Sequence, residues 1–359
     1  MEQRSQEREV RLVDPAWSVS ELMARIAKAL VSDGPALALT PISQSSVNSR
    51  IALICSTTGS SGTAKEVGLA ATSLLASAKA SNAFLGATFG STWSLLLPLN
   101  HIAGINVLIR SLELGTTPTS LIGYEGKYPR VDFTAIVPTQ LFRALNGDEY
   151  LREHLQGAKA VLVGGAALSQ ELRGAAESAG INLIETYGST ETSGGCIYNG
   201  KPLHGVDVKI DESMRISIKG NVLAYSYLNP DLQLTDNEGW YRTSDCGRIV
   251  DGKVIVDGRA DDVVITGGEN ISLSAIERVI SGEFPESQSA AFALPDSEWG
   301  QAIHLAVVGL SEANNSRIQE LLTKAIAPAA KAKAIHHLQE LPLIGIGKVD
   351  REELVRRFQ

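Results

Sequence analysis

The fold is decided by the stretch Thr57-Thr58-Gly59-Ser60-Ser61-Gly62-Thr63-Ala64-Lys65-Glu66-Val67. It follows the apolar run 51–54, which predicts a buried strand. The glycines let backbone N–H groups turn toward an anion, the hydroxyl groups add donors, and Lys65 adds a positive charge. We therefore predict a phosphate-binding loop, with a polar surface turn as the alternative.

This loop differs from the one in P-loop nucleoside triphosphatases. Their motif needs Gly directly before its Lys and Ser or Thr directly after it. Here Ala64 precedes Lys65 and Glu66 follows it. The P-loop class is therefore excluded, and the meaning of the loop depends on the motifs that come after it.

Composition sets the outer bounds of the interpretation. A chain of 359 residues with 44% hydrophobic and 20% charged residues predicts a globular protein of two or three domains. A net charge of −8 argues against nucleic acid or an anionic membrane as the main partner, because both need a basic surface. The three cysteines are too widely spaced for a zinc site or a disulfide framework. With a charged N-terminus and no apolar run of about 18 residues, we expect a cytoplasmic protein.

The order of the predicted elements indicates the fold class. Strand-like and helix-like segments alternate up to about residue 205, which predicts parallel sheets with helices on their faces. Short strands follow, including a hairpin at Asp251-Gly252. We predict an α/β protein with a large N-terminal domain, residues 1–257, that includes a β-rich subdomain. Residues 258–359 would form a small, mobile α+β C-terminal domain.

Six further motifs follow the loop. In chain order they are PLNHIAG (98–104), VGGA (163–166), YGSTE (187–191), WYRTSDCGR (240–248), GRADD with GGENI (258–271) and GKVDR (347–351). Together with the loop they resemble the motifs of the adenylate-forming superfamily, which contains acyl- and aryl-CoA ligases, luciferases and the adenylation domains of peptide synthetases. The resemblance covers residues 50–359.

The resemblance implies an ATP site. Asp245 and Arg259 would hold the ribose, whose two hydroxyls suit a carboxylate, and Tyr187 would stack on adenine. From the residues alone, a solvated turn aspartate and a core tyrosine remain alternatives. The implied ATP-binding residues are Thr57, Thr58, Gly59, Ser60, Ser61, Gly62, Gly164, Gly165, Ala166, Tyr187, Gly188, Asp245 and Arg259.

The resemblance also implies catalytic groups, namely Lys348, Lys65, Thr190 and His101. Both lysines would offset negative charge during phosphoryl transfer, and Thr190 would donate to the α-phosphate. Glu191 would be the magnesium ligand, because a carboxylate oxygen suits a hard cation. A helix-capping glutamate and a solvated terminal lysine are the alternatives for Glu191 and Lys348.

A moving C-terminal domain is implied as well. Asp261 would be the hinge about which this domain rotates between two half-reactions. After rotation, Gly267, Gly268 and Glu269 would line the tunnel for the CoA thiol, where glycine lets a narrow pantetheine arm pass close to the backbone.

The acid is suggested by the stretch PLNHIAGINVLIRSLELG, which is most similar to the o-succinylbenzoate–CoA ligases of menaquinone (vitamin K2) biosynthesis. His101, Arg110 and Ser189 would bind this acid. An arginine suits the carboxylate that remains after the first one is activated, while a helix-surface arginine is the alternative.

The resemblance thus implies an AMP-forming ligase that uses ATP, Mg²⁺ and CoA. Another aryl or acyl acid, a carrier-protein thiol, and a non-catalytic nucleotide-binding homologue are alternatives. Only 56 residues precede Thr57, so a second subunit could supply parts of the pocket, and a homodimer is a further hypothesis.

Overall fold

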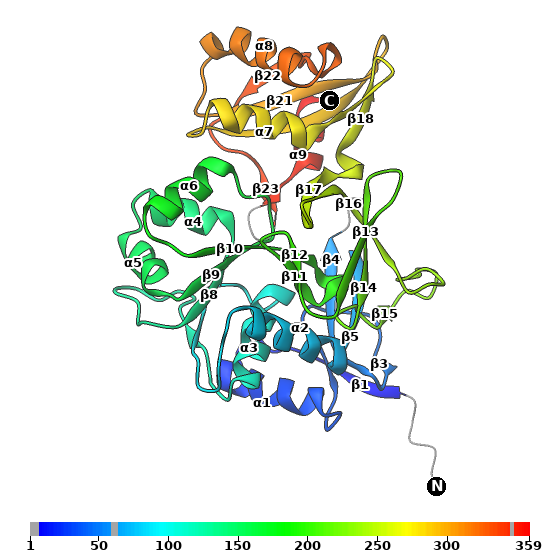
Figure 1. Ribbon diagram of the computed structural model, residues 1–359. Helices are drawn as coiled ribbons and strands as arrows, with labels where there is room; N and C mark the ends of the chain where they lie inside the picture. Colours follow the sequence, from blue (N-terminus) through cyan, green and yellow to red (C-terminus); the bar gives the residue numbers. More distant parts are fainter. Residues whose placement is uncertain (1–6, 59–63, 345–347) are drawn as a thin grey trace.

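The computed structural model describes residues 7–58, 64–344 and 348–359. It is a mixed α/β structure built from several sheets and helices (Figure 1), as predicted. Within these ranges, no helix is both long and apolar enough to cross a membrane.

The described residues on either side of the predicted phosphate loop belong to a six-stranded sheet with the order β15-β5-β4-β2-β1-β3. β1, β2 and β4 are parallel, and the other strands are antiparallel to their neighbours. The strands are β1 (Glu7–Leu12), β2 (Ala36–Ala38), β3 (Ser46–Asn48), β4 (Ile51–Thr58), β5 (Ala64–Ala70) and β15 (Ser226–Tyr227). Since β4 and β5 pair with each other, the loop connects two antiparallel strands.

Helix α1 (Val19–Leu30) begins where the sequence predicts it, because Ser18 followed by Glu21 three residues later is the sequence signature of a capping box. The Ser18 side chain accepts from the Glu21 backbone N–H at 3.2 Å, and Glu21 Oε2 accepts from the Ser18 backbone N–H at 2.8 Å. This capping box satisfies donors at the start of the helix. Leu22, Met23 and Ile26 form the buried side of α1.

The second sheet has seven strands in the order β12-β11-β10-β9-β8-β6-β7. The strands from β7 to β10 are parallel, and β11 and β12 extend the sheet in an antiparallel sense. They are β6 (Trp93–Leu95), β7 (Thr119–Ser120), β8 (Phe133–Ile136), β9 (Ala160–Val163), β10 (Leu183–Ser189), β11 (Gly194–Tyr198) and β12 (Lys201–Pro202).

Helices cover the second sheet on both faces. α2 (Ala71–Phe84) and α3 (Ile102–Glu113) pack between the two sheets, and their side chains share one hydrophobic core with both. α4 (Pro138–Leu145), α5 (Glu149–Gly157) and α6 (Gln170–Ser178) form a separate core on the opposite face (Figure 1).

A four-stranded antiparallel sheet follows, as the short alternating segments predict. Its strands are β13 (Val206–Ile210), β14 (Arg215–Gly220), β16 (Tyr241–Val250) and β17 (Lys253–Arg259). Asp251 and Gly252 connect β16 to β17 with φ angles of 50° and 72°. Both values lie in the left-handed region that a tight hairpin turn requires, so the predicted hairpin is confirmed.

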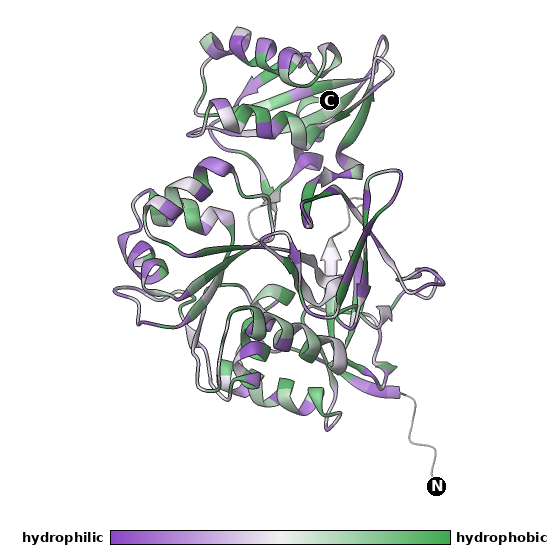
Figure 2. Ribbon diagram, viewed as in Figure 1, coloured by the Kyte–Doolittle hydropathy of each residue, from purple (hydrophilic) through white to green (hydrophobic). Residues whose placement is uncertain are grey.

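The last hundred residues pack around their own cores, whose members all follow residue 263. The elements are β18 (Val263–Thr266), β19 (Glu269–Ser272), α7 (Leu273–Glu283), β20 (Gln288–Asp296), β21 (Gly300–Val308), α8 (Asn315–Ala325), β22 (Ala334–His337), β23 (Leu343–Ile344), β24 (Lys348–Val349) and α9 (Arg351–Phe358). Figure 2 shows hydrophobic and hydrophilic residues alternating along α7 and α8, as expected for helices that pack one side on a sheet.

Candidate active site

Tyr227 lies between two of the predicted site residues. Its hydroxyl donates to Glu191 Oε1 at 3.0 Å, and the Lys65 ammonium lies 5.6 Å from the centroid of its ring. Burial and the neighbouring Glu191 charge raise the pKa of Tyr227, so this hydroxyl remains a donor. The structure therefore brings Lys65 and Glu191 to the same tyrosine, although 126 positions of sequence separate them.

A second tyrosine holds the predicted ribose-binding carboxylate. Tyr187 Oη donates to Asp245 Oδ2 at 2.6 Å, and burial raises the pKa of the Tyr187 hydroxyl. Asp245 on β16 is the register partner of Arg259, the last residue of β17. Tyr187, Asp245 and Arg259 therefore meet at one place.

At two positions of the predicted nucleotide site, packing leaves room only for glycine. A Cβ on Gly188 would lie 2.1 Å from the carbonyl oxygen of Gly194, and a Cβ on Gly164 would lie 2.3 Å from Thr186 Oγ1. Both distances are too short for any side chain. Gly164 follows the carboxyl end of β9 and Gly188 lies within β10, so both belong to the edge where ligands of parallel sheets bind. Gly165 and Ala166 follow Gly164 directly and are exposed.

Ser189, Thr190 and Glu191 follow directly. Ser189 ends β10, and Thr190–Thr192 form a short 3-10 helix. Thr190 and Glu191 are buried, and the backbone N–H of Ala224 donates to the Glu191 carbonyl at 2.8 Å. The main-chain bond holds the Glu191 backbone, and Tyr227 holds its side chain. A glutamate that only capped a helix would not need these contacts.

Arg110 is a core residue and not a helix-surface residue. Only 4% of it is exposed, its Nη2 donates to Tyr198 Oη at 3.2 Å, and its guanidinium lies 5.1 Å from the centroid of the Trp93 ring. Its Nε has no partner, and no described carboxylate forms an ion pair with it. His101 precedes α3 as its N-cap and is half-buried, so two of the three predicted acid-binding residues, His101 and Arg110, lie at or within one helix. The third, Ser189, ends β10.

Several predicted site residues cannot be placed. Gly59, Ser60, Ser61 and Gly62 lie outside the described residues, as do the side chains of Thr58, Asp261 and Lys348. The Thr57 side chain donates to the Lys65 carbonyl at 3.3 Å across the hairpin. The backbone of Lys348 begins β24, which pairs with β23. Asp261 belongs to the short 3-10 helix 260–262 between β17 and β18, where a hinge between domains is expected.

The predicted CoA-tunnel residues form the exposed turn between β18 and β19. Gly267 and Gly268 have φ angles of 57° and 82°, and Glu269 begins β19. The Gly267 N–H donates to the Trp299 carbonyl at 3.1 Å.

The arginine of the GKVDR motif has a structural role. Arg351 Nη2 donates to both carboxylate oxygens of Glu277 at 2.7 and 2.9 Å, and its Nε donates to the Ala291 carbonyl at 3.0 Å. A further nitrogen lies 3.8 Å from Asp262 Oδ1. Arg351 therefore ties the segment that carries Lys348 to α7, to β20 and to the residue after the predicted hinge.

Magnesium fits this site only together with a nucleotide. No group of three or more His, Cys, Asp or Glu residues in the described ranges could hold a metal ion. Glu191 offers a buried carboxylate with one oxygen engaged by Tyr227, which leaves Oε2 as a hard donor. Mg²⁺ is commonly held by one or two carboxylates plus substrate phosphates, and this arrangement agrees with that pattern.

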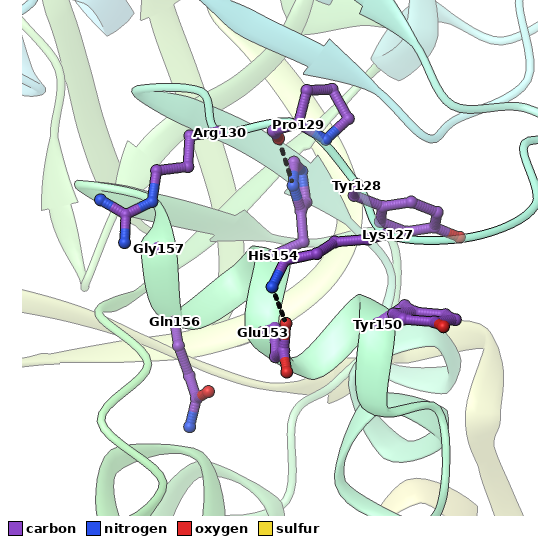
Figure 3. A pocket seen from close by; sticks show the side chains of 9 residues that line it. All are labelled: Lys127, Tyr128, Pro129, Arg130, Tyr150, Glu153, His154, Gln156 and Gly157. Atoms are coloured by element: carbon purple, nitrogen blue, oxygen red, sulfur yellow. Dashed lines mark hydrogen bonds and ion pairs between the residues drawn. The ribbon is translucent and has the colours of Figure 1, made fainter.

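A surface hollow of about 380 Å³ lies away from these residues. Figure 3 shows its lining, with Lys127 reaching Glu153 and His154 directed to the Pro129 carbonyl. All of its lining residues precede β8 or β9, so it lies at the amino ends of the parallel strands. It is formed by Lys127, Tyr128, Pro129, Arg130, Tyr150, Glu153, His154, Gln156 and Gly157.

Sequence motifs did not indicate Tyr227, Tyr198 or Trp93. Tyr227 lies on a strand of two residues, and Tyr198 and Trp93 are fully buried. Each looks like an ordinary core residue in the sequence. Only the contacts with Glu191 and Arg110 connect them to the site.

The fold, the ordered motifs and this site define a class of enzyme that activates acids with ATP. Residues 2–222 match the AMP-binding enzyme family. The chain belongs to this family, whose match covers more than half of its length.

More particular similarities follow. A probable 2-succinylbenzoate–CoA ligase from Mycobacterium tuberculosis is 33% identical over 374 residues, covering 96% of this chain and 97% of that protein. A solved E. coli MenE variant with bound OSB-AMS is 27% identical, with a TM-score of 0.74 over 86% of this chain and 69% of that one.

A third comparison shows the fold alone. The o-succinylbenzoate coenzyme A synthetase (MenE) from Bacillus subtilis, in complex with ATP and magnesium ion, is 21% identical to this chain. Its TM-score is 0.74 over 96% of this chain and 83% of that one.

Proposed function

We propose that this chain is an AMP-forming 2-succinylbenzoate–CoA ligase that acts in menaquinone (vitamin K2) biosynthesis. The observation that carries the proposal is Arg110, a buried guanidinium with no carboxylate partner among the described residues. An unpaired buried charge is unfavourable, so this position favours an anionic group on the bound acid. The mycobacterial relative and the E. coli structure support the same acid.

The first half-reaction forms the acyl-adenylate. A succinyl carboxylate oxygen of the acid attacks the α-phosphorus of ATP, the bond to the bridging oxygen breaks, and pyrophosphate leaves. Lys65 and Lys348 offset the charge on the phosphoryl oxygens, and Thr190 donates to the α-phosphate. Asp245 and Arg259 hold the ribose, and Tyr187 contacts the adenine.

The second half-reaction forms the thioester. The CoA sulfur attacks the activated carbonyl carbon, the carbon–oxygen bond to phosphate breaks, and AMP leaves while the thiol proton is released. Gly267, Gly268 and Glu269 line the thiol's path in this step. Magnesium, when bound with ATP, would neutralise triphosphate charge, and Glu191 is the protein group that would hold it.

We propose a domain boundary at 257/258 and a hinge at Asp261. Separate hydrophobic cores before and after this boundary support the division. A cytoplasmic location agrees with ATP and CoA as substrates. A homodimer remains a hypothesis, which sedimentation of the purified chain would test.

The function is tested by incubating the purified chain with ATP, Mg²⁺, CoA and a panel of acids. The panel contains 2-succinylbenzoate, benzoate and 3-benzoylpropionate, which is the first acid without its ring carboxylate. Mass spectrometry should find the CoA thioester of 2-succinylbenzoate with an equal amount of AMP. Efficient use of another acid would contradict the substrate, and AMP with pyrophosphate but no thioester would contradict CoA as the acceptor.

Replacing Arg110 by Met should separate binding from stability. Loss of a desolvated charge pair costs about 2–5 kcal/mol, so KM for 2-succinylbenzoate should rise at least about 30-fold, while KM for 3-benzoylpropionate changes little. The melting temperature should hold or rise, because Met replaces an uncompensated buried charge with an apolar side chain. Arg143→Met, an exposed change on α4, is the matched control. An equal rise in KM for both acids would refute the role of Arg110.

A further inference from the structure

Buried polar atoms without partners gather around Arg110. Within the described residues they include Asn82 Oδ1, Trp93 Nε1, Asn106 Oδ1, Arg110 Nε, Ser111 Oγ and Ser193 Oγ. These atoms come from α2, α3, β6 and the residue before β11. Buried polar groups normally have partners, so a group of unpartnered ones indicates a place built for a ligand or for water.

Tyr198 lies inside this group and has two polar contacts. It is 0% exposed, its Oη accepts from Arg110 Nη2 at 3.2 Å, and it lies 2.8 Å from Ser81 Oγ. Arginine nitrogens only donate, so the phenol oxygen is the acceptor in the first contact. Its own proton is then available to Ser81. Arg110, Tyr198 and Ser81 thus form one chain of hydrogen bonds from α3 through β11 to α2.

The surroundings hold this chain in one arrangement. The Phe84 ring meets the Tyr198 ring edge-on at 5.2 Å, and the Trp93 ring faces the guanidinium of Arg110. With Nη2 engaged by Tyr198, the Nε–H of Arg110 has no acceptor. A carboxylate binds a guanidinium most strongly through two parallel N–H donors, so the orientation of the guanidinium decides whether such an approach is open.

We propose that Tyr198 is a positioning residue that orients Arg110 toward the second carboxylate of the acid and so determines the preference for a dicarboxylic substrate. This inference rests on the proposed function. A phenylalanine would fill the same space and pack on the same ring, so packing alone does not explain the hydroxyl. Core packing does not require a hydroxyl here, so we assign the hydroxyl to its contact with the charged Arg110 side chain.

The test is Tyr198→Phe, assayed with 2-succinylbenzoate and 3-benzoylpropionate. KM for 2-succinylbenzoate should rise about tenfold, because one hydrogen bond to a charged group is lost. The kcat for this acid, KM for ATP and KM for 3-benzoylpropionate should stay within about twofold of the unchanged enzyme. Tyr150→Phe, an exposed change on α5, is the control.

Ser81→Ala is a second variant that keeps the phenol and removes its other partner. It should give the same pattern with a smaller rise in KM for 2-succinylbenzoate. Equal changes with both acids, or no change with either, would overturn the positioning role while the ligase activity stands. If the unchanged enzyme forms no thioester from 2-succinylbenzoate, the proposed function fails first, and this inference fails with it.

Discussion

Tyrosine hydroxyls orient two carboxylates of the candidate site. Tyr187 donates to Asp245, and Tyr227 donates to Glu191. Each bond engages one oxygen of its carboxylate. Such supporting bonds hold a functional side chain in one rotamer before a ligand arrives, which lowers the entropic cost of binding.

Replacing Tyr187 by Phe should weaken ATP binding and leave the acid unaffected. The ring that contacts adenine remains, but Asp245 loses a bond of 2.6 Å from a neutral donor to a charged acceptor. Such bonds contribute about 1.5–3 kcal/mol, so KM for ATP should rise roughly tenfold or more in steady-state assays. Tyr150→Phe is the control. If KM for ATP stays unchanged, the bond does not position Asp245.

Motifs predicted the carboxylates, but not the tyrosines that hold Glu191 and Arg110. Asp245, Glu191 and Arg110 stand in recognisable spacings. Tyr227 reaches Glu191 only because β15 pairs with β5, a strand about 160 positions earlier. Tyr198 reaches Arg110 only through the packing of β11 on α3. Such contacts depend on tertiary structure, and a single sequence does not encode them locally.

At the scale of elements, the sequence predicts a helix start or a turn correctly where the stabilising contacts join residues that are close in the chain. The Ser18 and Glu21 capping box and the Asp251-Gly252 turn involve neighbours in the chain, and both were predicted. β1 was not predicted, because its sequence EREVRL resembles a charged tail. Its Arg8 is buried, and its guanidinium donates to the carbonyls of Gly34, Ile51 and Ala29. Backbone carbonyls that are distant in the sequence thus satisfy the buried guanidinium, which allows this charged segment to form a strand.

Helix α9 covers a pair of histidines on neighbouring strands. His304 Nδ1 lies 3.0 Å from His336 Nε2, and the His336 ring stacks on Phe358 at 3.8 Å. Burial lowers the pKa of both imidazoles, and each is further lowered by a neighbouring histidine. Lys333, Asp296 and His337 are the nearby charged or titratable groups.

Acid should therefore weaken the packing of α9. The folded pKa values lie below the unfolded value of 6.5, so the unfolded chain binds more protons as pH falls below that value. Stability then rises with pH through this window and is lost as pH falls. Melting temperatures between about pH 7.5 and about pH 5.5 should show this slope, and His304→Gln with His336→Gln should reduce it. His204→Gln is the control, and an unchanged slope in the double variant would contradict the assignment.

At the scale of the whole molecule, the small C-terminal region carries both Lys348 and Gly268, which we assign to different half-reactions. Arg351 binds Glu277 and lies near Asp262, so the segment after Lys348 is tied to α7 beside the proposed hinge. We therefore propose that this region moves as one body. Rotation about Asp261 would therefore replace Lys348 at the active site by the β18–β19 turn.

Two variants at these positions should give opposite results. Lys348→Ala should lower adenylation, measured as ATP–pyrophosphate exchange, by about 100-fold or more. Thioester formation from supplied acyl-adenylate should stay within about threefold of the unchanged enzyme. Gly268→Asn should lower thioester formation from supplied acyl-adenylate and leave ATP–pyrophosphate exchange nearly unchanged. A Cβ at Gly268 meets nothing within 4 Å, and asparagine tolerates its φ of 82°, so the turn persists while a side chain enters the thiol's path.

The contrast between these two variants decides whether the small domain alternates. Loss of both half-reactions in each variant would mean that Lys348 and Gly268 act in a single arrangement of the domains, and the hinge at Asp261 would then have no catalytic role. Opposite losses require each residue to be near the reacting atoms in a different step. Because Arg351 holds this region together, local flexibility of one loop would not produce that result.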